Sequence, residues 1–154
     1  MEVSDILRPA AVKVVGSVSS KKRLFQDLSE LVAGVYGLDS AQAFAALQER
    51  ENLGPTGVGH GIALPHARIE GLDRVVGAFV RFERPVDFDS VDRQPVDLVF
   101  SLFAPQGSGV EHLKALALVS RTMRNASIAA KLRANDDADT LHTILTETQG
   151  SRAA

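Results

Sequence analysis

The run from Val96 to Phe103 constrains the fold more strongly than any other stretch of this chain. Its apolar residues occupy both faces of an extended segment, with Val96, Leu98, Phe100 and Leu102 on one face and Val99 and Phe103 on the other. A strand that is apolar on both faces is buried on both sides, as in sheets whose two faces are covered by helices. We therefore expect a central strand in a layered α/β domain.

The other periodic segments complete that architecture. Further strands are expected at 11–15, 62–64 and 75–82, and helices at 24–36, 39–52, 109–124, 127–133 and 137–149. Ser19 or Ser20 and then Asp39 are suitable N-caps, and Gly37 ends the first helix. The order of elements predicts a mixed parallel and antiparallel β-sheet of about five strands, flanked by helices on both faces. The long hairpin between 75–82 and 96–103 favours an antiparallel pair.

Length and charge narrow the classes of function. A chain of 154 residues suits a single domain, 1–154, with a core of about 6–149 and a flexible tail at 150–154. The net charge of −2 argues against nucleic-acid binding, which needs a basic surface. The absence of cysteine excludes disulfides and thiolate chemistry. The sequence has no signal peptide and no run of roughly 18 apolar residues, so we expect a cytoplasmic protein that is not embedded in a membrane.

The segment GHGIALPHAR, from Gly59 to Arg68, holds the strongest candidate for chemistry. Pro65 fixes its own φ and biases the preceding residue toward an extended conformation, so His66 follows a stiff stretch at the end of a short strand. A neutral imidazole is nucleophilic and can accept a phosphoryl group. The glycines before it leave backbone N–H groups uncovered for an anion, although they equally suit a turn. For any isolated histidine, a capping or packing role is the alternative.

Two further residues can join His66 at one edge of the sheet. Ser108 and Glu111 have capping-box spacing, which puts His112 in the first turn of a helix, where unpaired N–H groups attract anions. Arg50 falls in the last turn of an earlier helix, and its guanidinium suits planar oxyanions. A surface histidine and a helix-end arginine that stabilises the helix dipole are the alternatives.

Together these residues resemble the IIA family of the bacterial phosphotransferase system, in its fructose/mannitol branch. The run RENLGPTGVGHGIALPHAR, from Arg50 to Arg68, is similar to the active-site segment of that family. The run RPVDFDSVDRQPVDLVFSLFAP resembles its main strand pair, and EHLKALALVSRTM resembles its second-histidine helix. The match covers about Ile6 to Gln149, and the wording TGVGHGIALPH is most similar to the nitrogen-regulatory IIA proteins.

The resemblance implies a role for each matching residue. His66 would be phosphorylated through Nε2, and both His112 and Arg50 would contact the phosphoryl group. Phosphate binding would also fall to three residues of the glycine-rich segment: Thr56, Gly57 and Gly59.

The resemblance also implies a phosphoryl-carrier protein, a phosphotransferase that needs no cofactor and no metal. Its donor would be an HPr-like phosphocarrier, itself charged by an Enzyme I from phosphoenolpyruvate. Because a IIB or IIC domain is absent, we expect a regulatory role in which the phosphorylation state controls binding to other proteins, whose identity stays open. A IIA component of a fructose/mannitol-type sugar transporter and a regulatory binding module without phosphotransfer are the alternatives.

We expect the partner to dock on an apolar face with a polar rim around His66. Leu53, Val58 and Ile69 are the candidates for that face. Phosphorylation would add about two negative charges there, which repels an acidic partner or admits a basic one.

The sequence supports a metal-dependent function less well than it supports phosphoryl transfer. His60, His66 and His112 with a carboxylate can hold zinc, but no HExxH pattern is present and five residues between two histidines is not a common ligand spacing. The acidic run at 87–97 lacks the glycine and the final glutamate of an EF-hand loop.

Overall fold

The centre of the fold is a six-stranded mixed sheet, and the computed structural model describes its backbone within residues 1–153 and side chains within residues 1–147. The strands are β1 (Val12–Val15), β2 (Gly57–Gly59), β3 (Ile62–Ala63), β4 (His66–Ile69), β5 (Val76–Val86) and β6 (Val96–Pro105). Their order is β1-β5-β6-β3-β2, and β4 also pairs with β6. β5 and β6 are antiparallel, as predicted, whereas β1 is parallel to β5 and both β3 and β4 are parallel to β6.

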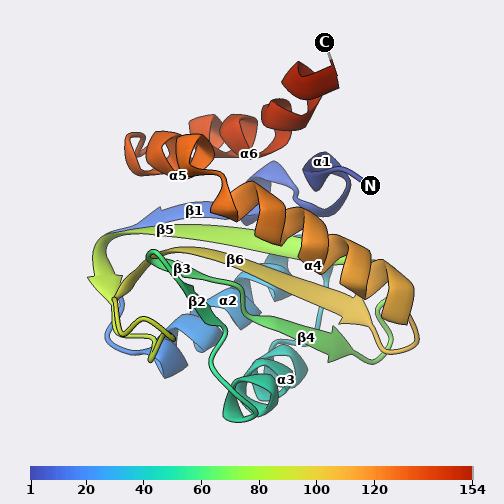
Figure 1. Cartoon of the computed structure of the whole chain (residues 1–154). Helices are drawn as coiled ribbons and strands as arrows, with labels where there is room; N and C mark the ends of the chain where they lie inside the picture. Colours follow the sequence, from blue (N-terminus) through green and yellow to red (C-terminus); the bar gives the residue numbers. More distant parts are fainter. Residues whose placement is uncertain (154) are drawn as a thin grey trace.

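Helices cover both faces of this sheet (Figure 1). In that view α2 (Lys21–Tyr36) and α3 (Ser40–Asn52) lie below the sheet, and α4 (Gly109–Arg124), α5 (Ala126–Arg133) and α6 (Ala138–Ala153) lie above it. A short helix α1 (Val3–Ile6) and a 3₁₀ turn (Pro9–Ala11) lead into β1. The predicted α/β class is confirmed, with six strands rather than about five. The side chains of the predicted tail, 150–154, lie outside the described residues.

The pair β5–β6 forms the middle of the hydrophobic core. Val99, Phe100 and Phe103 of β6 are each 0% exposed, so this strand is buried on both faces, as its sequence predicts. The rings of Phe79 and Phe100 meet edge to face with centroids 6.1 Å apart. Full burial of one such side chain contributes about 1.5–3 kcal/mol, so the core fixes the register of the strand that ends beside α4.

Helix ends follow the sequence signals at three positions and depart from them at one. Ser20 accepts a hydrogen bond from the Arg23 N–H, Asp39 accepts one from the Gln42 N–H, and Gly37 ends α2 with a left-handed φ of 77°. The predicted capping box at Ser108 is wrong. Its hydroxyl donates to the Pro105 carbonyl instead, because the tight turn after β6 brings that carbonyl within 2.9 Å. α4 nevertheless begins at Gly109, as expected.

His66 follows the short strand β3, as expected, but it also begins a further strand, β4, that the sequence does not predict. The reason is Pro65, which has no N–H to donate and separates β3 from β4. Its carbonyl still accepts the Leu102 N–H at 2.9 Å, and the pairing resumes with His66 opposite Leu102. Because β6 ends at Pro105 and α4 starts soon afterwards, His66 and the first turn of α4 lie at the same end of the sheet.

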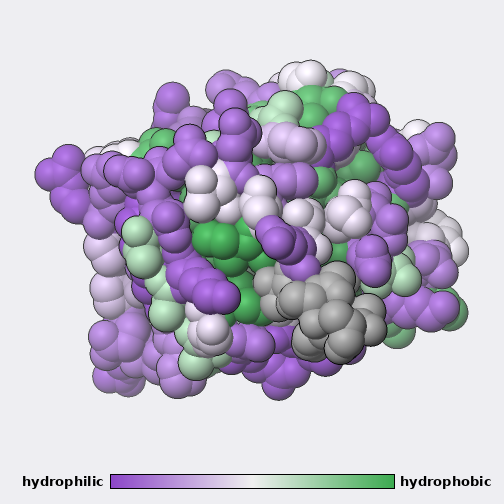
Figure 2. Space-filling model, turned by 90° about the horizontal axis from the view of Figure 1, so that it is seen from above, coloured by the Kyte–Doolittle hydropathy of each residue, from purple (hydrophilic) through white to green (hydrophobic). Residues whose placement is uncertain are grey.

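The outer surface is largely hydrophilic on the face seen from above, with an apolar recess near its middle (Figure 2). Within the described part of the chain, no helix is both long and apolar enough to cross a membrane.

Candidate functional site

His66 on β4 and His112 on α4 form a pair of neighbouring imidazoles. Their ring centroids are 5.5 Å apart, and the rings meet edge to face at 68°. The parallel pairing of β4 with β6 and the turn from β6 into α4 bring the two residues together, although 46 positions separate them in the sequence. The structure therefore joins the two histidines that the sequence predicts for one site.

The contacts of His66 define its tautomer. Nδ1 lies 2.9 Å from the Leu64 carbonyl oxygen, which can only accept, so Nδ1 carries the proton. Nε2 accepts a hydrogen bond of 3.3 Å from Nε of Arg50 and is therefore the nitrogen with the free lone pair. Arg50 comes from the last turn of α3, and its Nη1 donates to the Gly54 carbonyl at 3.0 Å. This third predicted residue thus contacts His66 directly.

His66 is held in its neutral form. Burial lowers its pKa below the ordinary value, the hydrogen bond to Leu64 opposes that shift, the charge of Arg50 lowers the pKa further, and Glu51 raises it. The net pKa lies below 6.5, so at neutral pH the ring is uncharged and Nε2 is available as a nucleophile.

His112 is buried and has one unsatisfied nitrogen. The residue is 6% exposed, and its Nδ1 accepts a hydrogen bond of 3.3 Å from Nε of Arg68. Nε2 must then carry the proton, and no acceptor for it exists among the described residues. Burial, followed by the nearby His66 and Arg68, lowers the pKa of His112 to about 4. A buried N–H without a partner is rare in folded proteins and calls for an explanation.

Arg68 is a site residue that the sequence reasoning missed. It lies two residues after His66 on β4, and residues two apart on a strand share a face, so the spacing itself was the available signal. Besides His112, its guanidinium reaches the Gln106 carbonyl at 3.4 Å. Arg68 therefore ties β4 to the turn that precedes α4 and fixes the tautomer of His112.

Thr56 contacts a buried carboxylate. Its N–H and its hydroxyl both donate to Glu51, at 3.1 and 2.5 Å, and Glu51 also receives Lys21 of α2 at 3.0 Å. The Glu51 side chain is 6% exposed. This cluster, which we call the Glu51 cluster (Lys21, Glu51 and Thr56), fastens the segment that carries Gly54, the partner of Arg50. Sequence reasoning did not single out Glu51 or Lys21.

Gly57 and Gly59 lie on β2, away from the pocket beside His66. A Cβ on Gly57 would come within 2.2 Å of the Ser90 hydroxyl, so the close approach of the 87–93 loop requires glycine there. Gly59 has a φ of +97°, which also favours glycine. Their predicted contact with phosphate, like that of Thr56, stays a prediction.

A shallow pocket of about 370 Å³ opens beside the imidazole, and its walls include Arg50, His66, Ala67 and Arg68. Three apolar side chains are exposed on the segments that carry the site: Leu53, a wall of this pocket just after α3, is 82% exposed, and Val110 and Leu113, beside His112 in the first turns of α4, are each 66% exposed. The prediction that Ile69 belongs to the docking face is wrong, because its side chain is part of the core and is 2% exposed.

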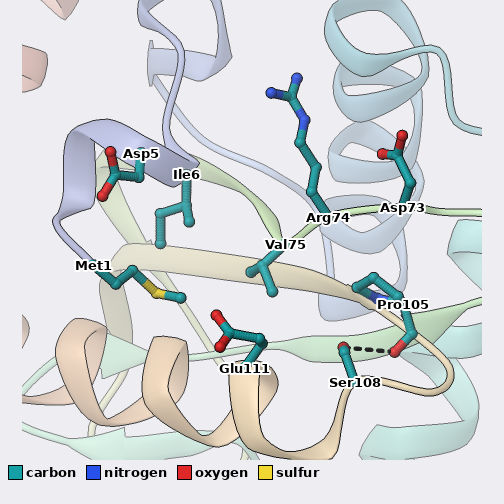
Figure 3. A pocket seen from close by; sticks show the side chains of 9 residues that line it. All are labelled: Met1, Asp5, Ile6, Asp73, Arg74, Val75, Pro105, Ser108 and Glu111. Atoms are coloured by element: carbon teal, nitrogen blue, oxygen red, sulfur yellow. Dashed lines mark hydrogen bonds between the residues drawn. The ribbon is translucent and has the colours of Figure 1, made fainter.

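A second pocket, of about 460 Å³, lies beside α1 and the first turn of α4 (Figure 3). Carboxylates of Asp5, Asp73 and Glu111 line it, and the dashed line in Figure 3 marks the bond from Ser108 to Pro105. Neither His66 nor His112 is among its walls. This pocket is therefore separate from the imidazole pair.

The proposed zinc cluster finds no support in the part of the chain that the structure describes. No group of three or more histidine, cysteine or acidic side chains is placed there to hold a metal ion. His60 lies in the turn between β2 and β3, where its N–H donates to Asp92.

The family of the chain follows from a match to a family model. Residues 5–148 match the model of the EIIA 2 component of the phosphoenolpyruvate-dependent sugar phosphotransferase system. The chain belongs to this family. Its fold is that of a IIA component, and the relatives narrow the class further.

Several of those relatives are nitrogen regulatory proteins. A nitrogen regulatory protein of Bradyrhizobium diazoefficiens is 44% identical over 145 residues, which cover 94% of this chain and 95% of that protein. The crystal structure of nitrogen regulatory protein IIA-Ntr from Neisseria meningitidis superposes with a TM-score of 0.87 at 37% identity, covering 94% of this chain and 99% of that one. The mannitol IIA of Escherichia coli shares the fold, with a TM-score of 0.71 at 18% identity and coverage of 87% and 96%. The chain is thus a IIA component most similar to regulatory members of the family.

Proposed function

We propose that this protein is a phosphoryl carrier that is phosphorylated on Nε2 of His66 by an HPr-like phosphocarrier. The observation that carries the proposal is the buried Nε2–H of His112, which has no acceptor among the described residues and belongs to a ring whose centroid lies 5.5 Å from that of His66. An anion attached to His66 would supply that acceptor. Arg50 and Arg68, the cationic groups in the walls of the pocket, would add charge-assisted hydrogen bonds to the same anion.

The transfer itself requires little rearrangement of covalent structure. The Nε2 lone pair forms the new N–P bond while the N–P bond of the donor breaks, and the donor nitrogen keeps the bonding electrons. Nδ1–H stays on His66, where the Leu64 carbonyl stabilises the positive charge that the ring acquires. Phosphoryl transfer depends mainly on position and on charge stabilisation. Arg50 releases Nε2 and donates to the equatorial oxygens together with His112.

The donor docks on the apolar side chains around the pocket. Leu53 is a wall of the pocket, and Val110 and Leu113 flank His112 in the sequence of α4. All three are exposed, and such residues suit the centre of a protein interface. An HPr-like phosphocarrier, charged by an Enzyme I from phosphoenolpyruvate, presents its own phosphohistidine to this surface. A protein that receives its phosphoryl group from these donors would act in the cytoplasm.

The output of the reaction is a change of surface charge. A phosphoryl group adds about two negative charges to a pocket whose walls hold two arginines and one glutamate, Glu49. Target proteins that bind one form and reject the other would convert this change into regulation. The similarity to nitrogen regulatory proteins supports a regulatory output over sugar transport.

Mass spectrometry tests the proposal. The protein is incubated with phosphoenolpyruvate, Enzyme I and an HPr-like phosphocarrier, and its intact mass is measured at neutral and acidic pH. We expect one acid-labile phosphoryl group, which is absent in His66→Ala. His60→Asn is the matched control, since His60 is an exposed histidine outside the pocket and asparagine tolerates its left-handed φ of 57°. Full labelling of His66→Ala would overturn the assignment.

A further inference from the structure

We propose a second binding site, for a small anionic amphiphile, in the groove between the β2–β3 turn and the junction of α4 with α5. Figure 1 shows the turn below that junction. The groove has a volume of about 670 Å³, within the range of sites for small molecules. Its walls are Val58, Gly59, His60, Ile62, Ser120, Met123, Arg124, Ala126, Ala129, Ala130 and Arg133.

The floor of the groove is apolar. Ile62, Met123 and Ala129 form it and are 4%, 1% and 7% exposed. Val58 stands at its edge and is 45% exposed, so an apolar surface continues from the floor to the rim. The small side chains of α5 leave the space open, because alanine at 126, 129 and 130 does not fill it. An apolar body of modest size fits this space.

The rim is cationic. Arg124 and Arg133 stand among the walls, and no carboxylate of the described residues does. Arg133 is shared, since its Nε and Nη2 bind Asp97 behind the groove. Arg124 is less committed, because its hydrogen bond within the described part of the chain uses only Nε, which donates to the Ser120 carbonyl at 3.3 Å. A carboxylate, sulfonate or phosphate on the ligand would bind the remaining N–H groups of Arg124.

The groove is held in shape before any ligand arrives. Asp92 accepts the N–H of His60, and Nη2 of Arg133 donates to the His60 carbonyl at 2.7 Å. Gly61 completes the turn with a φ of +76°, and a Cβ there would lie 2.6 Å from Nη2 of Arg133. These contacts fasten the turn to α5. A pocket that is already formed avoids the ordering cost of binding.

This site is independent of the phosphoryl pocket. The two share no wall residue, and the groove lies at the C-terminal end of α4 whereas His112 lies at the N-terminal end. Failure of one proposal therefore leaves the other standing.

The test uses a matched pair of probes, anilinonaphthalene sulfonate and the uncharged N-phenylnaphthylamine, in an amide NMR titration of the whole protein. We expect saturable binding of the sulfonate below about 1 mM, with shifts centred on the groove. Arg124→Gln should weaken it at least about fivefold and bring it close to the uncharged probe. Arg121→Gln, an exposed arginine of α4 outside the groove, is the control and should bind as the parent does.

A blocking variant completes the test. Ala130→Phe places a ring in the groove at an exposed helical position and should abolish binding of both probes. Circular dichroism checks its fold, and Ala126→Leu, exposed at the start of α5, serves as a second block. The proposal is overturned if the sulfonate does not saturate, if the shifts lie outside the groove, if the uncharged probe binds the parent equally well, or if neither block reduces binding.

Discussion

The two sides of the histidine pair are built differently. On the α3 side, Arg50 contacts His66 and Gly54, and the Glu51 cluster fastens the adjoining segment with three hydrogen bonds. On the α4 side, His112 is buried with a ring N–H that has no acceptor among the described residues. The polar groups of Arg50 and of the Glu51 cluster on the α3 side already have partners within the protein, whereas on the α4 side the proposed phosphoryl group would supply the missing acceptor. The difference separates residues that serve stability from residues that serve transfer.

The largest expected effect on stability comes from Glu51→Gln. The substitution weakens a nearly buried ion pair and leaves Lys21 without its main partner, so unfolding should become easier by about 2–3 kcal/mol. Urea unfolding measures this. Asp27→Asn is the control, because the Arg23–Asp27 pair is exposed on both sides and should change stability by about 0.5 kcal/mol or less. An equal loss of stability in both variants would show that the Glu51 cluster contributes no more than an exposed ion pair.

His112→Leu should slow phosphoryl transfer without lowering stability, in contrast to the loss of stability expected for Glu51→Gln. Removing a donor that stabilises the transferred group lowers the transfer rate by about 10²-fold. Unfolding should be unaffected or harder by about 1 kcal/mol, because an apolar side chain replaces a buried polar group without a partner. Rapid-quench labelling and urea unfolding measure the two quantities. A large loss of stability with a normal transfer rate would show that His112 serves stability rather than transfer.

The stability of the protein should fall in acid because of the histidine pair. The folded pKa of His112 is about 4, below the ordinary 6.5, so the unfolded chain binds more protons as the pH drops. Stability is therefore fully present above pH 6.5 and is lost progressively down to about pH 4; His66, whose pKa is also lowered, adds to this loss. Urea unfolding across that range should show a shallower dependence in His112→Leu. If the parent protein and His112→Leu lost stability in parallel as the pH falls, the buried imidazole of His112 would not be the cause of the loss.

Arg68→Gln should have the smallest effect. It removes one long hydrogen bond to Nδ1 of His112, worth about 1 kcal/mol, so transfer should slow by roughly fivefold. The sharper readout is the tautomer, since without Arg68 the His112 proton is free to move to Nδ1. Side-chain nitrogen NMR detects that change, and an unaltered tautomer would show that Arg68 does not fix it.

The sequence predicts the frame of the molecule well because burial follows periodicity. The two-sided apolar pattern of Val96–Phe103 identifies the central strand, and α4 begins at Gly109 as expected. The number of strands was underestimated because β2 and β4 are short and lie around a proline and several glycines. Such residues indicate turns more strongly than they indicate pairing with a distant strand.

The site was predicted in part for a similar reason. His66, His112 and Arg50 carry distinctive local signals, and the structure brings all three together. Glu51 and Lys21 carry no such signal, because a charged residue on a helix usually faces solvent and only the packing of α2 against α3 buries this pair. The burial of His112 likewise depends on long-range packing that helix spacing does not reveal.

Side-chain nitrogen NMR of the histidines, before and after phosphorylation, tests the central claim most directly. We predict that His66 carries its proton on Nδ1 and His112 on Nε2 in the unphosphorylated protein. After incubation with phosphoenolpyruvate, Enzyme I and the phosphocarrier, Nε2 of His66 should show the coupling to phosphorus, and the Nε2 proton of His112 should shift as it gains an acceptor. Phosphorus on Nδ1 of His66, or on His112, would contradict the account.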